Sequence, residues 1–227
     1  MNREAYFTPE TIREKSRAML DALASFRARH ADILFRPEHA ALLVLDMQEY
    51  FLREGSHAFI PSAPAIISNI KKLISKFYSL DRPVIFTRHI NGDADSGMMS
   101  RWWRDVLCAD SPDSAIIAAL DTTRGIVIHK TQYDAFYNTS LEETLRGRGV
   151  GQVIVTGVMT HLCCETTTRS AFVRGLEVFF CVDGTATYTE EAHCASLYNL
   201  AHGFAIPALC EEILSLTSCS QYYPLFL

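Results

Sequence analysis

The sequence predicts an α/β fold, a three-layer α/β/α sandwich built around a mostly parallel central sheet. Short runs rich in valine and isoleucine recur along the chain, and such runs are typical of strands buried on both faces. Segments with the periodicity of amphipathic helices separate these runs. Because strand–helix–strand units cross over with one handedness, this alternation places helices on both faces of a parallel sheet.

The first 35 residues are expected to form a helical arm, ahead of a domain that spans residues 36–227. Thr8 can cap a helix that runs to about His30, and Pro9 suits its first turn. Two arrangements are open for this helix. It either packs on its own domain or reaches a neighbouring subunit.

The remaining elements follow in a regular order. The predicted strands are residues 40–45, 83–86, 125–128, 152–155 and 178–182, with a further strand at 203–206. The predicted helices are residues 65–80, 140–148, 161–174, 189–203 and 208–216. The connection at residues 89–113 contains both tryptophans and is too long for a passive link, so we expect a functional loop or lid there.

The composition is that of an ordinary globular chain. Of the 227 residues, 48% are hydrophobic and 21% charged, and the formal net charge is -5. This mildly acidic balance, without a concentrated basic face, argues against a nucleic-acid partner. The sequence has neither a long apolar span nor an apolar signal core, so we expect no membrane partner and a cytoplasmic location. The seven scattered cysteines are interpreted as free thiols in a reducing compartment.

Three chemically distinctive side chains follow three of the predicted strands. Asp46 comes directly after the first run, Lys130 after the third and Cys163 shortly after the fourth. In open α/β sheets, ligands bind beyond the carboxyl ends of the strands. Because parallel strands bring these ends to one edge, we expect an acid, a lysine and a cysteine to converge there.

This combination suits nucleophilic catalysis by cysteine. The thiolate is the attacking species, and a free thiol with a pKa of about 8.5 supplies little of it at pH 7. A position in the first turn of a helix, beside the Lys130 ammonium, is expected to favour the thiolate of Cys163. Asp46 can take the thiol proton and later pass it to a leaving group. A lone cysteine is more often inert packing, and the neighbouring acid and lysine favour the reactive interpretation.

Two adjacent cysteines raise the question of which one is reactive. On a helix, Cys164 shares a face with Ala171 and Phe172, which are apolar, whereas Cys163 shares a face with polar residues such as Ser170. We therefore expect Cys164 to be buried packing and Cys163 to look into the cleft.

Aromatic and histidine side chains near the strand ends are the candidates for substrate binding. They are Phe51, His89, Trp102, Trp103, Tyr133, Phe136 and His161. The tryptophans can wall an apolar ligand, although one can equally be core, and the same alternatives apply to Tyr133 and Phe136. His161 either lines the cleft or caps the helix. Asp183 is interpreted as the cap of a turn.

Three motifs, in this order and spacing, resemble those of the isochorismatase-like superfamily of hydrolases over about residues 40–216. They are LVLDMQEYF at residues 43–51, KTQYDAF at residues 130–136 and TGVMTHLCCETTTRSAF at residues 156–172. The resemblance implies a Rossmann-like α/β/α domain and a catalytic triad of Asp46, Lys130 and Cys163. It also implies a homo-oligomer, a dimer or a tetramer.

The resemblance extends to the backbone of the third motif. It implies a cis peptide between Val158 and Met159. It also implies an oxyanion hole formed by backbone N–H groups of Met159, Thr160 or Cys163.

The superfamily divides by chemistry. Its cysteine members cleave C–N bonds of amides or carbamoyl groups through an acyl-enzyme. True isochorismatases hydrolyse a vinyl ether, use the aspartate as an acid and typically have glycine at the position of Cys163. The surroundings here resemble isochorismatases, but Cys163 resembles the amidohydrolase branch, and we follow the cysteine. Residues 89–96 read HINGDADS and lack the Asp-x-His metal motif of nicotinamidases, so we expect no metal and no cofactor.

Other functions stay open alternatives. An isochorismatase that uses Asp46 as its acid would retain activity after Cys163→Ala. A phospho-accepting signalling domain also places an aspartate and a lysine at strand ends, and acyl-phosphate labelling would reveal it. A non-catalytic binding protein on this fold is disfavoured by the intact set of Asp46, Lys130 and Cys163.

Overall fold

The computed structural model describes residues 2–92, 94–103 and 105–217, and these residues contain one six-stranded parallel sheet. Its strands are β1 (Ala40–Leu45), β2 (Val84–His89), β3 (Ile126–Lys130), β4 (Gln152–Val158), β5 (Glu177–Ala186) and β6 (Ile206–Ala208). The spatial order is β3-β2-β1-β4-β5-β6. The order therefore reverses between β1 and β4, which is where open α/β sheets form a crevice for ligands.

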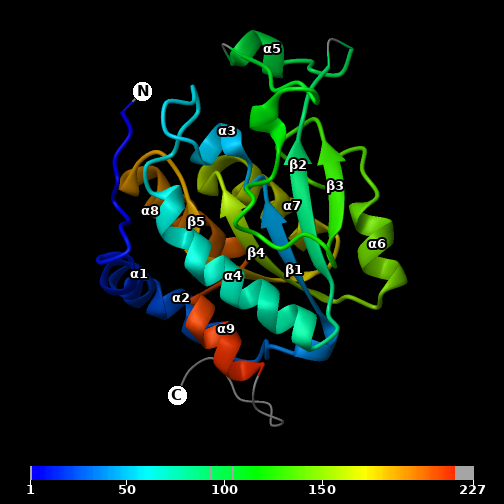
Figure 1. Cartoon of the computed structure of the whole chain (residues 1–227). Coiled ribbons are helices and arrows are strands. Elements are labelled where there is room, and N and C mark those ends of the chain that lie inside the picture. Colours follow the sequence, from blue (N-terminus) through cyan, green and yellow to red (C-terminus); the bar gives the residue numbers. More distant parts are fainter. Residues whose placement is uncertain (1, 93, 104, 218–227) are drawn as a thin grey trace.

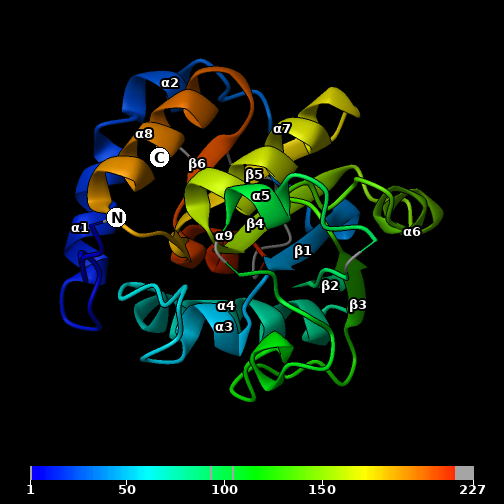
Figure 2. The same cartoon turned by 90° about the horizontal axis from the view of Figure 1, so that it is seen from above.

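Helices cover both faces of the sheet, which confirms the predicted three-layer sandwich (Figures 1 and 2). One face carries α4 (Ala63–Ser79) and α9 (Cys210–Leu216), and the other carries α7 (Glu165–Val173) and α8 (Glu190–Gly203). The remaining helices are α1 (Ile12–Asp21), α2 (Ala24–Ala28), α3 (Glu49–Leu52), α5 (Met99–Trp102) and α6 (Leu141–Gly147). Short turns of helix are η1 (Pro37–His39), η2 (Pro112–Ser114) and η3 (Thr160–Cys164).

The core forms where the apolar runs of the sequence meet. All six residues of β1 are fully buried, because helices cover this central strand on both sides. The helix α4 buries one stripe, with Ile66, Ile70, Leu73 and Phe77, and turns its lysines to solvent. None of the described helices has the length and apolar character needed to cross a bilayer.

The strand β5 is longer than predicted and corrects the interpretation of Asp183. This residue lies within the strand and does not cap a turn. Its carboxylate accepts the backbone N–H of Cys210 at 2.7 Å and the side-chain amide of Asn69 at 2.9 Å. Asp183 therefore ties β5 to the first turn of α9 and to α4.

The N-terminal helical segment is two helices, and not the single one predicted. Leu23 leaves the helical conformation between α1 and α2, and its side chain is buried. Both helices pack on their own chain, with Lys15 paired to Glu190 at 2.5 Å and Arg27 to Glu212 at 3.1 Å. The division into an arm at residues 1–35 and a domain at 36–227 stays a prediction.

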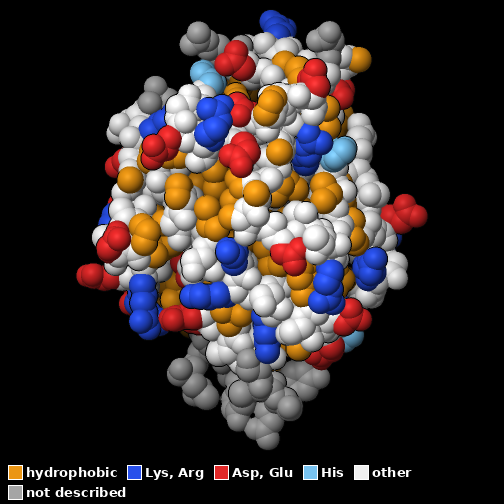
Figure 3. Space-filling view, viewed as in Figure 1, with side chains coloured by type: hydrophobic (Ala, Val, Ile, Leu, Met, Phe, Trp, Pro, Cys, Tyr) orange, Lys and Arg blue, Asp and Glu red, His pale blue; other side chains and the backbone are white. Residues whose placement is uncertain are grey.

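Surface charge is mixed in sign. Figure 3 shows acidic and basic side chains interspersed over the face that carries α4, with hydrophobic side chains between them. This face offers no continuous basic surface of the kind that binds a phosphate backbone.

Candidate functional site

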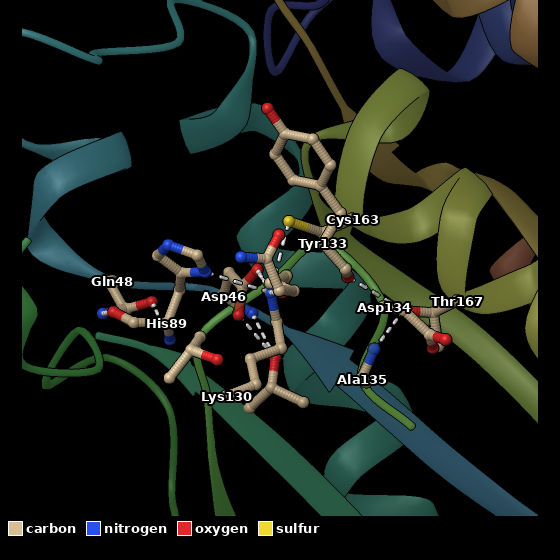
Figure 4. Close-up of polar contacts among 12 residues, drawn as sticks. Asp46, Gln48, His89, Lys130, Tyr133, Asp134, Ala135, Cys163 and Thr167 are labelled. Carbon is tan, nitrogen blue, oxygen red and sulfur yellow. Dashed lines mark hydrogen bonds and ion pairs between the residues drawn. The ribbon is translucent and has the colours of Figure 1, made fainter. Parts of the chain in front are cut away.

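The carboxyl ends of β1 and β3 and the turn after β4 bring three side chains into contact (Figure 4). The ammonium Nζ of Lys130 lies 2.8 Å from Oδ2 of Asp46 and 3.3 Å from Sγ of Cys163. The side chains of Asp46 and Lys130 are completely buried, and Cys163 is 6% exposed. The acid, lysine and cysteine that the sequence places at separate strand ends thus form one cluster.

The backbone around Asp46 is unusual. Asp46 follows β1 with φ of 51°, in the left-handed region that non-glycine residues rarely enter. Its N–H donates to the hydroxyl of Thr87 at 3.0 Å, and that hydroxyl donates to Oδ1 of Asp46 at 2.6 Å. A single side chain on β2 therefore holds both the backbone and the carboxylate of Asp46.

The turn that carries Cys163 is also irregular. Residues Thr160–Cys164 form a π-helical turn, so the predicted α-helix from residue 161 begins four residues later, at Glu165. Such wide turns are frequent at functional sites. The preceding Gly157 has φ of 110°, and a Cβ there would lie 2.0 Å from the carbonyl oxygen of Leu45. The peptide bond between Val158 and Met159 is cis.

Electrostatics of the cluster favour an ion pair beside a neutral thiol. Burial opposes both charges, but each charge stabilises the other, so the pKa of Asp46 is lowered and the pKa of Lys130 is raised. Burial, reinforced by the Asp46 carboxylate, raises the pKa of Cys163 to about 12 despite the opposing Lys130. The structure therefore favours a neutral resting thiol over the expected thiolate, because the sequence does not reveal how deeply the site is buried.

His89 contacts this cluster through Lys130. Its Nε2 lies 2.9 Å from Oδ1 of Asn91, and its Nδ1 lies 3.4 Å from Nζ of Lys130. Burial, helped by the Lys130 charge, lowers the pKa of His89 to about 4, so its ring is neutral at pH 7. A neutral ring beside the ammonium leaves Asp46 as the partner that carries the compensating charge.

Gln48 is a supporting residue that the sequence analysis missed. Its amide donates to the carbonyls of His89 and Ser114, at 3.0 Å and 2.9 Å, and accepts the N–H of His89 at 2.8 Å. This buried side chain fastens the turn after β1 to the end of β2. The sequence feature that could have identified Gln48 is its position two residues after Asp46.

The thiol opens into a pocket of about 250 Å³. Among the residues predicted to contact substrate, Phe51, His89, Trp103 and Tyr133 line this pocket. Trp103 donates its indole N–H to the hydroxyl of Tyr133 at 2.6 Å, which fixes both rings. Of the backbone positions considered for an oxyanion hole, Met159 and Cys163 also line the pocket.

The structure places the side chains of four of the predicted site residues away from the pocket. Trp102 is 73% exposed on the outer side of α5, and Phe136 is buried beneath the guanidinium of Arg174, whose carbon lies 4.6 Å from the ring centroid. His161 bonds through Nδ1 to Thr187 at 2.5 Å. The hydroxyl of Thr160 bonds to Nδ1 of His193 at 2.9 Å in the core. Sequence periodicity did not separate these residues from their neighbours that line the pocket.

Cys164 is fully buried, whereas Cys163 contributes to the pocket wall, as the helical faces predicted. Phe172 departs from that pattern. It is 49% exposed and packs its ring against Phe204. On a regular helix, Phe172 lies about 80° around the axis from Cys164, at the edge of the buried face, so its ring can reach solvent.

Part of the pocket comes from segments that the sequence analysis did not connect with the site. Arg3, His57, Asp105 and Tyr188 all line it, and Arg3 belongs to the N-terminal segment. Nothing in the local sequence identifies Arg3, because its role depends on contacts between residues far apart in the chain.

The described residues do not fit a metal centre. Across residues 2–92, 94–103 and 105–217, no three His, Cys, Asp or Glu side chains gather as ligands. Both ring nitrogens of His89 already face protein atoms, namely Asn91 and Lys130. The two nitrogens of His89 are thus engaged by protein groups in this structure.

The chain is similar to a known protein family and to several individual proteins. The model of the Isochorismatase domain matches residues 40–212. The chain is 42% identical over 179 residues to "Nicotinamidase 3" of Arabidopsis thaliana, covering 77% of this chain and 86% of that protein. It is 30% identical over 181 residues to "Isochorismatase" of Bacillus subtilis, covering 78% of this chain and 58% of that protein.

Among solved structures, a cysteine hydrolase from Pseudomonas syringae pv. phaseolicola superimposes with a TM-score of 0.78 at 28% identity. The match covers 81% of this chain and 94% of that one. Because the family model spans most of the chain, and the fold superimposes on that of a cysteine hydrolase, this protein belongs to the isochorismatase family of hydrolases.

Proposed function

We propose that this protein is a metal-independent cysteine hydrolase that cleaves the C–N bond of a small amide or carbamoyl compound through an acyl-enzyme. One observation carries the proposal. The thiol of Cys163 lies 3.3 Å from a buried lysine that pairs with Asp46 at 2.8 Å, at the inner end of a pocket. A nucleophile, a base and a fixed positive charge are thus in reach of one bound carbonyl carbon.

The chemistry divides into two steps. In the first, Asp46 takes the thiol proton as Sγ attacks the carbonyl carbon, and the protonated Asp46 then donates it to the departing nitrogen. Loss of the amine leaves a thioester on Cys163. In the second, Asp46 removes a proton from water, which attacks the thioester, and the thiol regains its proton as the acid leaves. Backbone N–H groups of Met159, Thr160 or Cys163 would hold the oxyanion in both steps.

The raised pKa of Cys163 is compatible with this sequence of events. The thiol does not need to ionise before substrate arrives, because Asp46 accepts the proton during attack. Lys130, which pairs with Asp46 at rest, then faces the sulfur and stabilises the negative charge that develops on it as the proton passes to Asp46.

The pocket walls indicate the class of substrate. Phe51, Trp103, Tyr133 and Leu162 present rings and apolar groups next to Cys163. Flat apolar walls of this size suit a planar acyl group, such as an aromatic ring that bears a carboxamide. The similarity to a protein named for nicotinamide hydrolysis makes aromatic carboxamides the first compounds to test.

An isochorismatase activity is the second candidate. The similarity to the Bacillus subtilis protein supports it, and Asp46 can act as a general acid toward a vinyl ether. The thiol of Cys163, in contact with Lys130, favours acyl transfer instead.

The test uses two neighbouring cysteines as variant and matched control. Ammonia release from a panel of aromatic and aliphatic amides is measured for the wild type, Cys163→Ala and Cys164→Ala, with circular dichroism to verify folding. We expect activity to disappear in Cys163→Ala and to persist in Cys164→Ala. Amide turnover by folded Cys163→Ala would overturn the mechanism. Pyruvate release from isochorismate by that variant would establish the second candidate.

We also propose that the protein acts in the cytoplasm as a homo-oligomer, a dimer or a tetramer. The six cysteines in the described part of the chain are all free thiols, as in proteins of a reducing compartment. Apolar side chains exposed on α7 and α8, such as Val173 and Tyr198, support an interface between subunits. Light scattering coupled to size-exclusion chromatography measures the subunit number.

A further inference from the structure

The N-terminal segment supplies one charged wall of the pocket. Arg3 lines the pocket together with Tyr50, His57 and Tyr188, although these residues lie far apart in the sequence. Its guanidinium carbon lies 4.6 Å from the centroid of the Tyr188 ring, and Nη2 donates to the carbonyl oxygen of His57. Cation–π contact and a backbone acceptor therefore hold the side chain over the cavity.

The backbone that carries Arg3 is fixed by its neighbours. The N–H of Glu4 donates to the carbonyl of Tyr188 at 2.9 Å, and the carbonyl of Glu4 accepts the hydroxyl of Ser62 at 3.2 Å. Tyr6 and Phe7, which follow, are buried in the core. The segment is therefore part of the folded pocket wall.

No carboxylate of the described residues lies within ion-pair distance of the Arg3 guanidinium. Within the described residues, Arg3 forms no ion pair with a carboxylate, since Glu4 instead accepts the N–H of Glu190 at 2.7 Å. The acid Asp105 also lines the pocket, and its carboxylate faces Nδ1 of His57 at 3.8 Å. Arg3 is the single arginine or lysine among the described residues that line this pocket.

The exposed fractions of these side chains show where each of them lies along the pocket. Arg3 is exposed, and the side chains of His57 and Asp105 are 41% and 53% exposed, whereas Cys163 is buried. The guanidinium therefore lies at the solvent end of the pocket and the thiol at the inner end. Aromatic walls connect the two ends.

From this arrangement we infer that Arg3 is a specificity-determining residue, which binds a carboxylate on the substrate remote from the bond that is cleaved. The substrate class is then a small planar amide that carries an anionic group at its far end. A guanidinium pairs with a carboxylate through two parallel N–H···O bonds, and the nearby Tyr188 ring keeps it oriented. The inference rests on the proposed function only for the nature of the cleaved bond.

Binding is measured in the full-length Cys163→Ala variant, because this variant does not turn over the ligand during the measurement. Titration calorimetry compares benzamide with 3- and 4-carbamoylbenzoate, which differ from it by one carboxylate. The same titrations are run after adding Arg3→Gln or, as a matched control, Arg13→Gln. Arg13 is an exposed arginine of α1 that does not touch the pocket.

We expect at least one carbamoylbenzoate to bind about tenfold more tightly than benzamide, as one charge-assisted pair provides. Arg3→Gln should abolish that advantage and Arg13→Gln should retain it. Equal binding of the acids and benzamide, or an advantage that survives Arg3→Gln, would overturn the inference. Arg3-dependent binding without hydrolysis by the wild type would reject the proposed function alone, and hydrolysis without preference for an acid would reject this inference alone.

Discussion

The hydroxyl of Thr87 donates to Oδ1 of Asp46 at 2.6 Å, inside the sheet and out of reach of solvent. The same hydroxyl accepts the backbone N–H of Asp46 at 3.0 Å. Asp46 lies in a sharp left-handed turn, and apart from Thr87 and Lys130 few groups hold its carboxylate. Thr87 therefore determines which oxygen of Asp46 faces Lys130 and the thiol.

Replacing Thr87 by valine keeps the shape of the side chain and removes the hydroxyl. We expect kcat toward an aromatic amide to fall about tenfold, because Oδ1 of Asp46 loses its hydrogen bond and Lys130 alone does not fix the orientation of the carboxylate. Unfolding in urea should also show a loss of about 1–3 kcal/mol, since the N–H of Asp46 loses its buried acceptor. Thr87→Ser, which retains the hydroxyl, is the control and should recover most of the rate. Equal rates for the valine and serine variants would contradict the positioning role.

Lys130 and Asp46 form a buried pair whose members depend on each other. Lys130→Met leaves an unpaired carboxylate in a dry site, so we expect a loss of about 3–5 kcal/mol in the free energy of unfolding. Without the ammonium, burial raises the pKa of Asp46.

The double variant Lys130→Met/Asp46→Asn removes the unpaired charge and should be more stable than Lys130→Met. Lys72→Met, on the exposed side of α4, is the control and should change stability by less than about 0.5 kcal/mol. Denaturant titrations of the wild type, Lys130→Met, Asp46→Asn and the double variant complete the cycle. If the loss of unfolding free energy in the double variant equals the sum of the losses in the two single variants, the two side chains are not coupled.

Two buried histidines make the fold sensitive to mild acid. Burial lowers the pKa of His193 to about 3 and that of His89 to about 4, whereas an unfolded histidine titrates at about 6.5. Below about pH 6.5 the unfolded chain binds protons that the folded chain excludes. The stabilising contribution is therefore complete above that pH and is lost as the pH falls toward the folded pKa values.

We expect each histidine to reduce the free energy of unfolding by about 1.4 kcal/mol per pH unit in this window. His193→Asn keeps a polar group toward Thr160 and should make the pH dependence shallower between pH 6 and 4. His129→Asn, at an exposed position of β3, should leave the slope as in the wild type. Urea titrations across this pH range measure it, and an unchanged slope in His193→Asn would refute the assignment.

Gly157 allows β4 to approach β1 at the site. A methyl group there would lie 2.0 Å from the carbonyl oxygen of Leu45, and φ of 110° is unfavourable for alanine. Gly157→Ala should cost more than about 3 kcal/mol or prevent folding.

Gly175 provides the matched comparison. It also has positive φ, of 81°, but a Cβ there meets no atom within 4 Å. Gly175→Ala should therefore cost only about 1 kcal/mol, the strain of the backbone alone. Thermal unfolding of the two variants distinguishes the cost of the steric contact at Gly157 from the cost of backbone strain alone at Gly175. Similar melting temperatures would contradict the argument.

The sequence by itself determined the layers of the fold and the edge where its chemistry gathers. Asp46 directly follows the buried apolar run of β1, and Lys130 is the last residue of β3, so local pattern was sufficient to place both at strand ends. The same reasoning distinguished Cys163 from Cys164, because a helical face is a property of neighbouring residues.

Only the tertiary structure decided the environment of these groups and the composition of the pocket. The pKa of Cys163 is raised because the site is buried and contains a carboxylate, which no local pattern expresses. Trp103 lines the pocket and Trp102 does not, because α5 ends at Trp102 and the backbone of Trp103 is extended. Arg3 reaches the pocket through contacts with His57 and Tyr188, and such contacts exist only after residues distant in the chain have been brought together by folding.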